Sequence, residues 1–257
     1  MNLTVDIGNT ETVVGLFEGI EPVHIWRLAT NRHHTADELA LSVEGLLRVL
    51  GAATLPEQAI VASVVPAMNR AWEGAGARLG LEVSFLTGSS PVPIRLEVDH
   101  PEEVGADRIA NTLAATEMFG VDTIVVDLGT AITFDCITAA GVFLGGAIAP
   151  GPANALDQLT RATAQLPQIE LDPPDRVIGR NTLECLRSGG FYTVVDGIDG
   201  MVDRIVEEWE PADPVIAATG GLAEVVAPHC RSVDRIEPAL TVTGLAIAGR
   251  YLGDPGE

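Results

Sequence analysis

The sequence contains no lysine, and arginine supplies all fifteen of its basic residues. A P-loop for ATP requires a lysine that reaches the β- and γ-phosphates, so this class of nucleotide-binding protein is excluded. The protein-kinase pattern needs a strand lysine and Schiff-base catalysis needs a lysine amine, so both are excluded as well. If the protein binds ATP, then backbone amides, hydroxyl groups, arginine and metal ions must hold the phosphates.

A basic surface and long hydrophobic runs are also missing. The 36 acidic residues outnumber the basic ones and give a formal net charge of −21. A surface this acidic repels a phosphate backbone, so we expect no nucleic-acid partner. No apolar run reaches the roughly 20 residues of a membrane helix, and the N-terminus lacks the basic region of a signal peptide. We therefore expect a cytoplasmic protein with no membrane partner.

Cysteine and histidine are too sparse to predict a metal site of their own. The three cysteines, Cys136, Cys185 and Cys230, are odd in number and widely spaced, which is typical of reduced thiols in the cytosol. None of the five histidines has a partner at metal-ligand spacing. We expect them to be ordinary surface or loop residues.

The rest of the composition is that of a globular protein. The chain has 257 residues, of which 47% are hydrophobic and 20% are charged. This length exceeds one typical core of about 100–150 residues, so we expect one large domain or two smaller ones.

Two segments share one pattern. Asp6-Ile7-Gly8-Asn9-Thr10 and Asp127-Leu128-Gly129-Thr130 each follow an apolar run and precede another. Each predicts a β-hairpin with an acidic residue at the strand end and a glycine turn, where amide and hydroxyl donors can face a phosphate. The Asp can hold a cation or its water shell. Gly-Asn is also a common pair in plain turns, but the repetition favours two related halves that face one nucleotide.

The order of predicted elements repeats as well. The first half is expected to contain strands at 2–7, 12–17, 22–28, 59–65 and 83–86, helices at 36–50, 67–79 and 107–119, and a loop with one edge strand at 88–104. The second half is expected to contain strands at 122–127, 131–137, 142–149 and 215–218 and helices at 152–164, 181–208, 221–227 and 238–252. Each half begins with an antiparallel meander. This order predicts an α/β fold of two duplicated domains, 1–118 and 119–257, with mixed sheets flanked by helices and a nucleotide cleft between them.

Three further motifs leave structural and functional interpretations open. Asp107, in Gly105-Ala106-Asp107-Arg108, is expected in the first turn of a helix, where a carboxylate also suits the helix dipole. Asn181-Thr182 is expected at the start of the long helix, where either residue can act as its N-cap. Thr219-Gly220-Gly221 follows a strand and suits either contact with an adenine ring or a tight turn.

Taken in order, these motifs resemble those of type III pantothenate kinases, a family of the acetate and sugar kinase, heat-shock-protein and actin superfamily. The likeness extends from Asp6 to the last helix. It is carried by Asp6-Ile-Gly-Asn-Thr10, Glu103-Val-Gly-Ala-Asp-Arg-Ile-Ala-Asn111, Asp127-Leu-Gly-Thr-Ala131, Gly145-Gly-Ala-Ile-Ala-Pro-Gly151 and Ile178-Gly-Arg-Asn-Thr182. The second and fifth motifs distinguish this family from the rest of the superfamily.

The resemblance implies two ribonuclease-H-like, actin-like ATPase domains and an activity. Family members use ATP to phosphorylate pantothenate to 4'-phosphopantothenate, the first step of coenzyme A biosynthesis. ATP would bind at Asp6, Ile7, Gly8, Asn9, Thr10, Glu11, Thr12, Val13 and Thr130.

The resemblance also implies roles for the other motifs. Asp107 would accept the proton of the substrate hydroxyl. Pantothenate would contact Gly105, Ala106, Asp107, Arg108 and Thr182. Asp127 would hold a monovalent cation, K⁺ or NH₄⁺, and Asp6 would hold the Mg²⁺ of ATP directly or through water. A homodimer is implied too.

The chain departs from the family pattern at one position. Members usually have a Tyr that contacts pantothenate seven residues before the Gly of Gly-Ala-Asp-Arg, and Val98 stands there instead. Asp99 or His100 could supply a polar contact in its place. Two alternatives to the kinase follow: a catalytically weak regulatory relative of the transcriptional accessory factor type, and another superfamily activity such as a phosphatase or a sugar kinase. Retention of both Asp107 and Asp127 favours the kinase.

Overall fold

The computed structural model describes residues 1–51, 56–162 and 166–252. The chain folds into two compact units. The first unit comprises Met1–Met118, Gly141–Phe143 and Ala239–Glu257, and the second comprises Phe119–Ala140 and Leu144–Pro238. The predicted division into 1–118 and 119–257 differs from this grouping chiefly at the C-terminal helix, which groups with the first unit.

The first unit is built on a five-stranded sheet with the strand order β3-β2-β1-β4-β5. The strands β1 (Asn2–Ile7), β2 (Glu11–Glu18) and β3 (Glu21–Ala29) form the predicted antiparallel meander. The strands β4 (Gln58–Ser63) and β5 (Glu82–Phe85) continue the sheet in parallel on the other side of β1. The helices α1 (Ala36–Leu50) and α2 (Pro66–Leu79) make the two crossovers.

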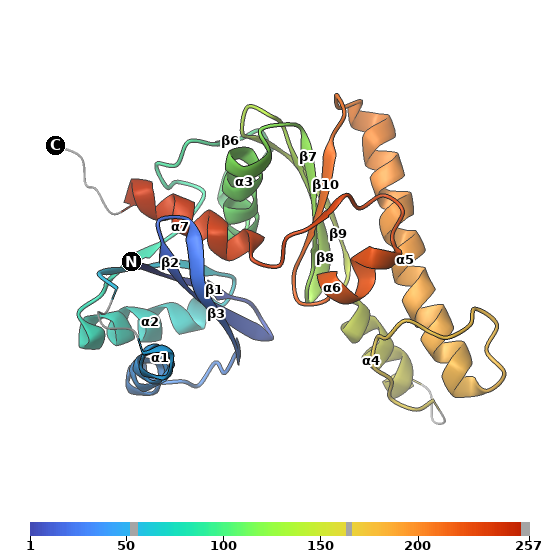
Figure 1. Ribbon diagram of the computed structural model, residues 1–257, viewed down its shortest axis with the longest axis horizontal. Coiled ribbons are helices and arrows are strands. Elements are labelled where there is room, and N and C mark those ends of the chain that lie inside the picture. The colour runs from blue at the N-terminus through green and yellow to red at the C-terminus, as the bar shows by residue number, and fades with distance from the viewer. Residues whose placement is uncertain (52–55, 163–165, 253–257) are drawn as a thin grey trace. The chain divides into compact units, whose positions relative to one another are not determined.

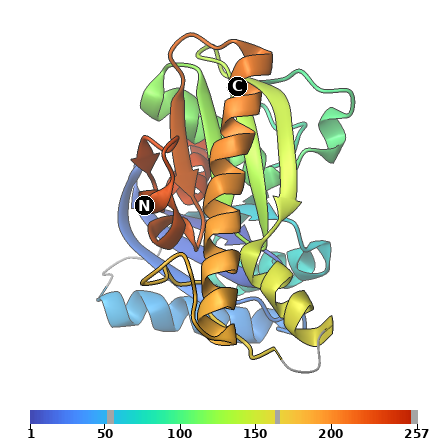
Figure 2. The same cartoon turned by 90° about the vertical axis from the view of Figure 1, so that its right-hand side faces the viewer.

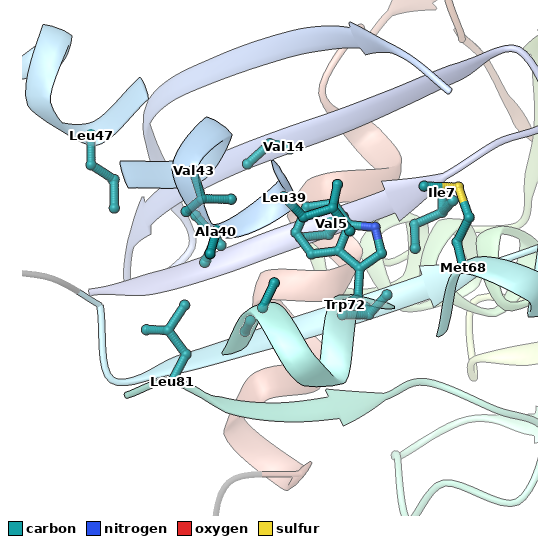
Figure 3. Packing of buried hydrophobic residues seen from close by; sticks show 14 of the residues in the cluster. Val5, Ile7, Val14, Leu39, Ala40, Val43, Leu47, Met68, Trp72 and Leu81 are labelled. Atoms are coloured by element: carbon teal, nitrogen blue, oxygen red, sulfur yellow. The ribbon is translucent and has the colours of Figure 1, made fainter. Parts of the chain in front are cut away.

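Both crossover helices pack on one face of this sheet (Figure 1). Alternate residues of β1, namely Leu3, Val5 and Ile7, are buried there, as the period of a strand requires. Figure 3 shows the indole of Trp72 beside Val5 and Leu39, in the middle of this core. The other side chains of β1, including Asp6, therefore point to the opposite face.

The helix α7 (Leu240–Leu252) covers that opposite face and contacts β1, β2 and β4. It also lies against α3 (Ala106–Phe119), where a Cβ on Gly244 would come within 1.9 Å of the Ala110 carbonyl oxygen. The Thr241 hydroxyl donates to Asn111 Oδ1 at 2.8 Å beside this contact. These contacts explain why the C-terminal helix groups with the first unit.

The segment before α3 contains β6 (Arg95–Leu96) and the 3-10 turn η1 (Pro101–Glu103). The strand β6 pairs in parallel with Val142–Phe143, the first residues of β9 (Val142–Pro150). This confirms the single edge strand that we predict between residues 88 and 104. The turn η1 is not predicted, because three residues are too few to show a period.

The second unit repeats the strand connections of the first. Its strands have the order β11-β10-β7-β8-β9, in which β7 (Thr123–Leu128) pairs antiparallel with β8 (Ala131–Ile137) and parallel with β10 (Val215–Thr219). The short strand β11 (Arg235–Ile236) extends the sheet in parallel beyond β10 and is absent from the predicted elements. Strands β7 to β11 therefore correspond to β1 to β5, which confirms the predicted duplication.

One long helix, α5 (Thr182–Trp209), covers a face of the second sheet (Figure 2). Its buried side chains Phe191, Val195 and Ile198 pack with residues of β7, β8 and β10. The helix α4 (Pro152–Ala162) precedes α5 in the chain. The predicted end of α4 at residue 164 lies outside the described residues. The predicted helix at 221–227 is instead α6 (Ala223–Val226) followed by the 3-10 turn η2 (Ala227–His229), because Pro228 cannot donate to the helical ladder.

The helix ends have local caps, and the N-cap expected at Asn181-Thr182 is confirmed. Thr35 and Glu38 form the reciprocal capping box of α1, and Gly51 ends that helix with a φ of 73°. Asn181 caps α5 by accepting a hydrogen bond from the Glu184 N–H at 3.0 Å. These ends involve residues a few positions apart, which is why the sequence predicts them. Among the described residues, no helix is both long and apolar enough to cross a membrane.

A buried carboxylate on α5 anchors the segment before β11. Asp199 is 2% exposed and accepts hydrogen bonds from the backbone N–H groups of Arg231 and Ser232, both at 2.9 Å, and from the Ser232 hydroxyl at 2.8 Å. Burial alone would raise the pKa of Asp199, but the hydrogen bonds from Ser232 and Arg231 outweigh it and lower that pKa. Its stabilising effect is therefore present above the unfolded-state pKa of about 3.9 and is lost as the pH falls through the folded-state value.

We expect Asp199→Ala to lower the free energy of unfolding at pH 7 by about 3 kcal/mol, because the N–H groups of Arg231 and Ser232 lose a buried acceptor. The measurement is denaturant unfolding at pH 7 and again at pH 3.5, where the difference from the wild type should shrink. The matched control is Asp196→Ala, which removes an exposed carboxylate from the same helix and should change the free energy of unfolding little. Equal effects of the two substitutions would contradict the anchoring role.

Candidate active site

The first predicted phosphate hairpin is formed by β1 and β2. Ile7 pairs with Thr12, so residues 8–11 make the turn, and the Gly8 N–H donates to the Glu11 carbonyl at 3.0 Å. A Cβ on Gly8 would come within 2.8 Å of that carbonyl oxygen, so the position requires glycine. Asn9 and Thr10 are exposed at the tip. The turn therefore presents an amide and a hydroxyl side chain beside the backbone, the donor types that a phosphate needs.

The turn is braced by a residue that the sequence does not single out. The Thr30 hydroxyl, just after β3, donates to the Gly8 carbonyl at 2.8 Å and lies 2.8 Å from the Thr12 hydroxyl. The Thr30 N–H donates to the Thr10 carbonyl at 2.9 Å. Thr30 lacks a motif of its own, and only the pairing of β2 with β3 brings it to the hairpin. It fixes the loop in one shape before any ligand binds.

The second predicted hairpin, formed by β7 and β8, has the same plan with a shorter turn. Leu128 pairs with Ile132, so residues 129–131 make the turn, and the Gly129 N–H donates to the Ala131 carbonyl at 3.0 Å. The Asn154 side chain donates to the Thr130 carbonyl at 3.0 Å. The first turn thus contains one residue more than the second.

Glycine makes room for the carboxylate of the second hairpin. Asp127 pairs with Thr219 at the end of β10, and Gly220 follows with a φ of 91°. A Cβ on Gly220 would lie 2.4 Å from Asp127 Oδ1 and 2.7 Å from the Leu128 N–H nitrogen. Thr219-Gly220-Gly221 therefore forms a tight turn at the Asp127 carboxylate.

The Gly-Ala-Asp-Arg segment lies at the start of α3, as predicted. The Asp107 carboxylate accepts a hydrogen bond from the Arg108 N–H at 2.8 Å, and a Cβ on Gly105 would lie 2.4 Å from Asp107 Oδ1. Burial raises the pKa of Asp107 above its ordinary value, and the N–H and positive charge of Arg108 oppose that rise. A carboxylate with a raised pKa is a better proton acceptor than an exposed one.

Arg108 is held by an aromatic side chain as well as by its place on the helix. Its guanidinium carbon lies 4.9 Å from the centroid of the buried Phe143 ring, at the start of β9. A cation over a ring face is stabilised by the quadrupole of the ring. The contact joins the start of α3 to the strand that β6 pairs with.

The remaining predicted site residues lie in the segment before α3 and at the start of α5. Val98 is half-buried between β6 and η1, whereas Asp99 and His100 beside it are exposed. Thr182 is exposed and is the first residue of α5 in the second unit. The first unit thus carries Asp6–Val13 and Gly105–Arg108, and the second unit carries Asp127, Thr130 and Thr182.

Asp6, the residue predicted to hold Mg²⁺, lies near the end of β1. Among residues 1–51, 56–162 and 166–252, no group of three or more His, Cys, Asp and Glu side chains could hold a metal ion together. Mg²⁺ in nucleotide sites typically takes one or two carboxylates and completes its shell with phosphate oxygens and water. Asp6 at the end of β1 fits that pattern.

Comparison with known proteins agrees with this geometry. A family model described as type III pantothenate kinase matches residues 2–204. The type III pantothenate kinase of Acidothermus cellulolyticus is 44% identical over 254 residues, which cover 96% of this chain and 97% of that protein.

Two solved structures share the fold at lower identity. A putative Baf family transcriptional activator from Campylobacter jejuni has a TM-score of 0.59 at 21% identity and covers 96% of this chain and 97% of its own. A putative 2-dehydro-3-deoxygalactonokinase from Sinorhizobium meliloti has a TM-score of 0.61 at 12% identity, covering 100% and 98%. At such identities the likeness concerns the fold alone. The family model and the close relative establish that the chain belongs to the type III pantothenate kinase family.

Proposed function

We propose that this protein transfers the γ-phosphate of ATP to the hydroxyl of pantothenate and so makes 4'-phosphopantothenate, the first step of coenzyme A biosynthesis. Membership of the kinase family supports ATP with a divalent metal and pantothenate as the reactants. The observation that carries the proposal is Asp107, a carboxylate of raised pKa at the start of α3 within the family's Gly-Ala-Asp-Arg motif. The proposed compartment is the cytoplasm.

Phosphoryl transfer depends mainly on positioning and on neutralising the phosphate charge. Backbone N–H groups, Asn9 and Thr10 of the first hairpin would hold the phosphates, and Thr130 would add a contact from the second. Mg²⁺, held at Asp6 directly or through water, would supply positive charge that lysine provides in other kinases. The other residues of 6–13 would shape the loop.

Asp107 would carry the proton of the reaction. As the pantothenate oxygen bonds to the γ-phosphorus, the bond from that phosphorus to the bridging oxygen breaks and ADP leaves with the electron pair. The hydroxyl proton passes to an Asp107 carboxylate oxygen. Gly105, Ala106 and Arg108 would line the pantothenate site, and Thr182 would add a contact. Val98 in place of the family Tyr removes one such contact.

Neither of the two alternatives has support of its own. The likeness to the Campylobacter protein concerns the fold alone, so it does not favour a regulatory role. The relative that covers almost the whole chain is named as a pantothenate kinase, which does not favour a phosphatase or sugar kinase.

Asp107→Asn should lower kcat by at least roughly 100-fold, because an amide cannot accept the hydroxyl proton. Affinity for Mg·ATP should be unchanged. In the wild type, kcat/KM should fall as the pH decreases through the raised pKa of Asp107, at a higher pH than for an ordinary Asp. The assay follows ADP release with ATP, Mg²⁺ and K⁺, with and without pantothenate.

The control for this assay is Asp172→Asn, which removes an exposed carboxylate from the loop before α5 and should leave turnover unchanged. ADP release that does not depend on pantothenate would indicate another superfamily activity. A folded wild type that releases no ADP would favour the regulatory alternative. Near-normal turnover of Asp107→Asn would mean that another group accepts the proton.

We also propose that Asp127 binds K⁺ or NH₄⁺. Replacing K⁺ by Na⁺ should lower activity about fivefold or more, and Asp127→Asn should abolish that difference. Gly220→Ala should weaken the K⁺ response too, since its Cβ would displace the Asp127 carboxylate. Gly197→Ala on α5, whose added Cβ meets nothing within 4 Å, is the matched control. A K⁺ response that survives in Asp127→Asn would rule out this cation site.

A homodimer is proposed with exposed apolar side chains of the second unit in its interface. Ile148, Val177 and Ile178 of that unit are 68%, 66% and 83% exposed. We expect Ile178→Asp to raise the dimer dissociation constant by about tenfold or more, since it places a charge in an apolar interface. Sedimentation equilibrium measures this constant, and Val49→Asp, at an 88% exposed position of α1, is the control. An unchanged dissociation constant would place the interface elsewhere.

A further inference from the structure

The first hairpin has an arginine beside it that none of the roles above uses. The Arg32 Nη2 donates a hydrogen bond to Asn9 Oδ1 at the tip of the turn, at a distance of 2.8 Å. Because the chain contains no lysine, a side chain that is always positively charged can only be an arginine at this turn. The other arginine near the hairpin is Arg27, and its Nη1 pairs with the Glu11 carboxylate at 2.5 Å.

The backbone that carries Arg32 is fixed on both sides. Thr30 is bonded to the hairpin turn through its hydroxyl and its N–H. Asn31 forms the next turn by accepting hydrogen bonds from the His33 N–H and, through its carbonyl, from the His34 N–H, both at 3.1 Å. Thr35 then caps α1. The turn therefore holds Arg32 next to the hairpin without a ligand, so little conformational entropy would be lost on binding.

The charge of Arg32 has no acidic partner among the described residues. Its contact is to a neutral amide, and within the described part of the chain its guanidinium forms no ion pair. A guanidinium has five N–H donors and can bind two phosphate oxygens at once. In a chain with a net charge of −21, a positive group at the tip of a phosphate loop also offsets repulsion of the incoming anion.

We propose that Arg32 binds the terminal phosphates of ATP together with Asn9, and that Thr30 is a positioning residue for this turn. The inference rests on the proposed function, since it requires ATP at the first hairpin. The ligand class is a nucleoside di- or triphosphate. A nucleoside monophosphate lacks the phosphates that Arg32 would contact, so its binding affinity should not depend on this residue.

The competing explanation is that Arg32 only braces the turn through Asn9. An exposed hydrogen bond of this kind stabilises a protein little, and the hairpin already has three contacts to Thr30, two to the turn and one to Thr12. A brace would affect every nucleotide alike and would lower the melting temperature. A phosphate ligand would affect ATP and ADP but not AMP.

The test is calorimetric titration of Mg·ATP, ADP and AMP into the full-length protein and its variants. We expect Arg32→Gln to weaken ATP binding by roughly 10- to 100-fold, as for the loss of charge-assisted hydrogen bonds, and to leave AMP binding unchanged. The ATP affinity of Arg32→Lys should lie between that of the wild type and that of Arg32→Gln. Arg48→Gln, which removes the same charge from an exposed site on α1, should bind ATP like the wild type.

A second pair of variants tests the positioning residue. Thr30→Val should weaken ATP binding, and Thr30→Ser should retain it, because Ser keeps the hydroxyl that donates to the Gly8 carbonyl. Thermal unfolding of each variant separates this effect from loss of folding.

The outcomes that overturn the proposal are distinct. Equal ATP affinity of the wild type and Arg32→Gln would remove the phosphate role. A parallel loss for ATP and AMP, with a lower melting temperature, would show a brace instead. A folded wild type that binds no nucleotide would contradict the proposed function itself, and the role of Arg32 with it.

Discussion

The central strand of each sheet is paired on both sides, and the candidate site depends on this pairing. β1 lies between antiparallel β2 and parallel β4, and β7 lies between antiparallel β8 and parallel β10. With both edges bonded, the strand ends cannot slip, since a shift of one residue would turn every buried side chain outward. Asp6 and Asp127 therefore occupy equivalent positions, each one residue before the end of its strand.

A second constraint connects Asp107 to the same framework. α3 carries Asp107 at its start and is held against α7 by the backbone contact at Gly244 and the hydrogen bond from Thr241. α7 in turn packs on β1, which carries Asp6. Asp107 and the first hairpin thus belong to one packed body, although about a hundred residues separate them in the chain.

The features predicted correctly from the sequence are those that local chemistry determines. The cap at Asn181, the glycine turns and the strand meanders each involve residues within one element or one turn. What the sequence does not reveal depends on contacts between distant residues. The grouping of α7 with the first unit, the brace by Thr30 and the anchor at Asp199 have no period or motif, and β11 and η1 are too short to show one.

The extra residue in the first hairpin turn makes the strand pairing of the two halves differ by one position. Because of it, Asp6 faces Val13 across its hairpin, whereas Asp127 faces Thr133. A segment of fixed length taken from one hairpin and placed in the other would therefore shift the strand pairing by one residue. The neighbours of each Asp would then lie on the wrong face of the sheet. The two hairpins are therefore not interchangeable parts of the chain, although their strands have the same pairing order.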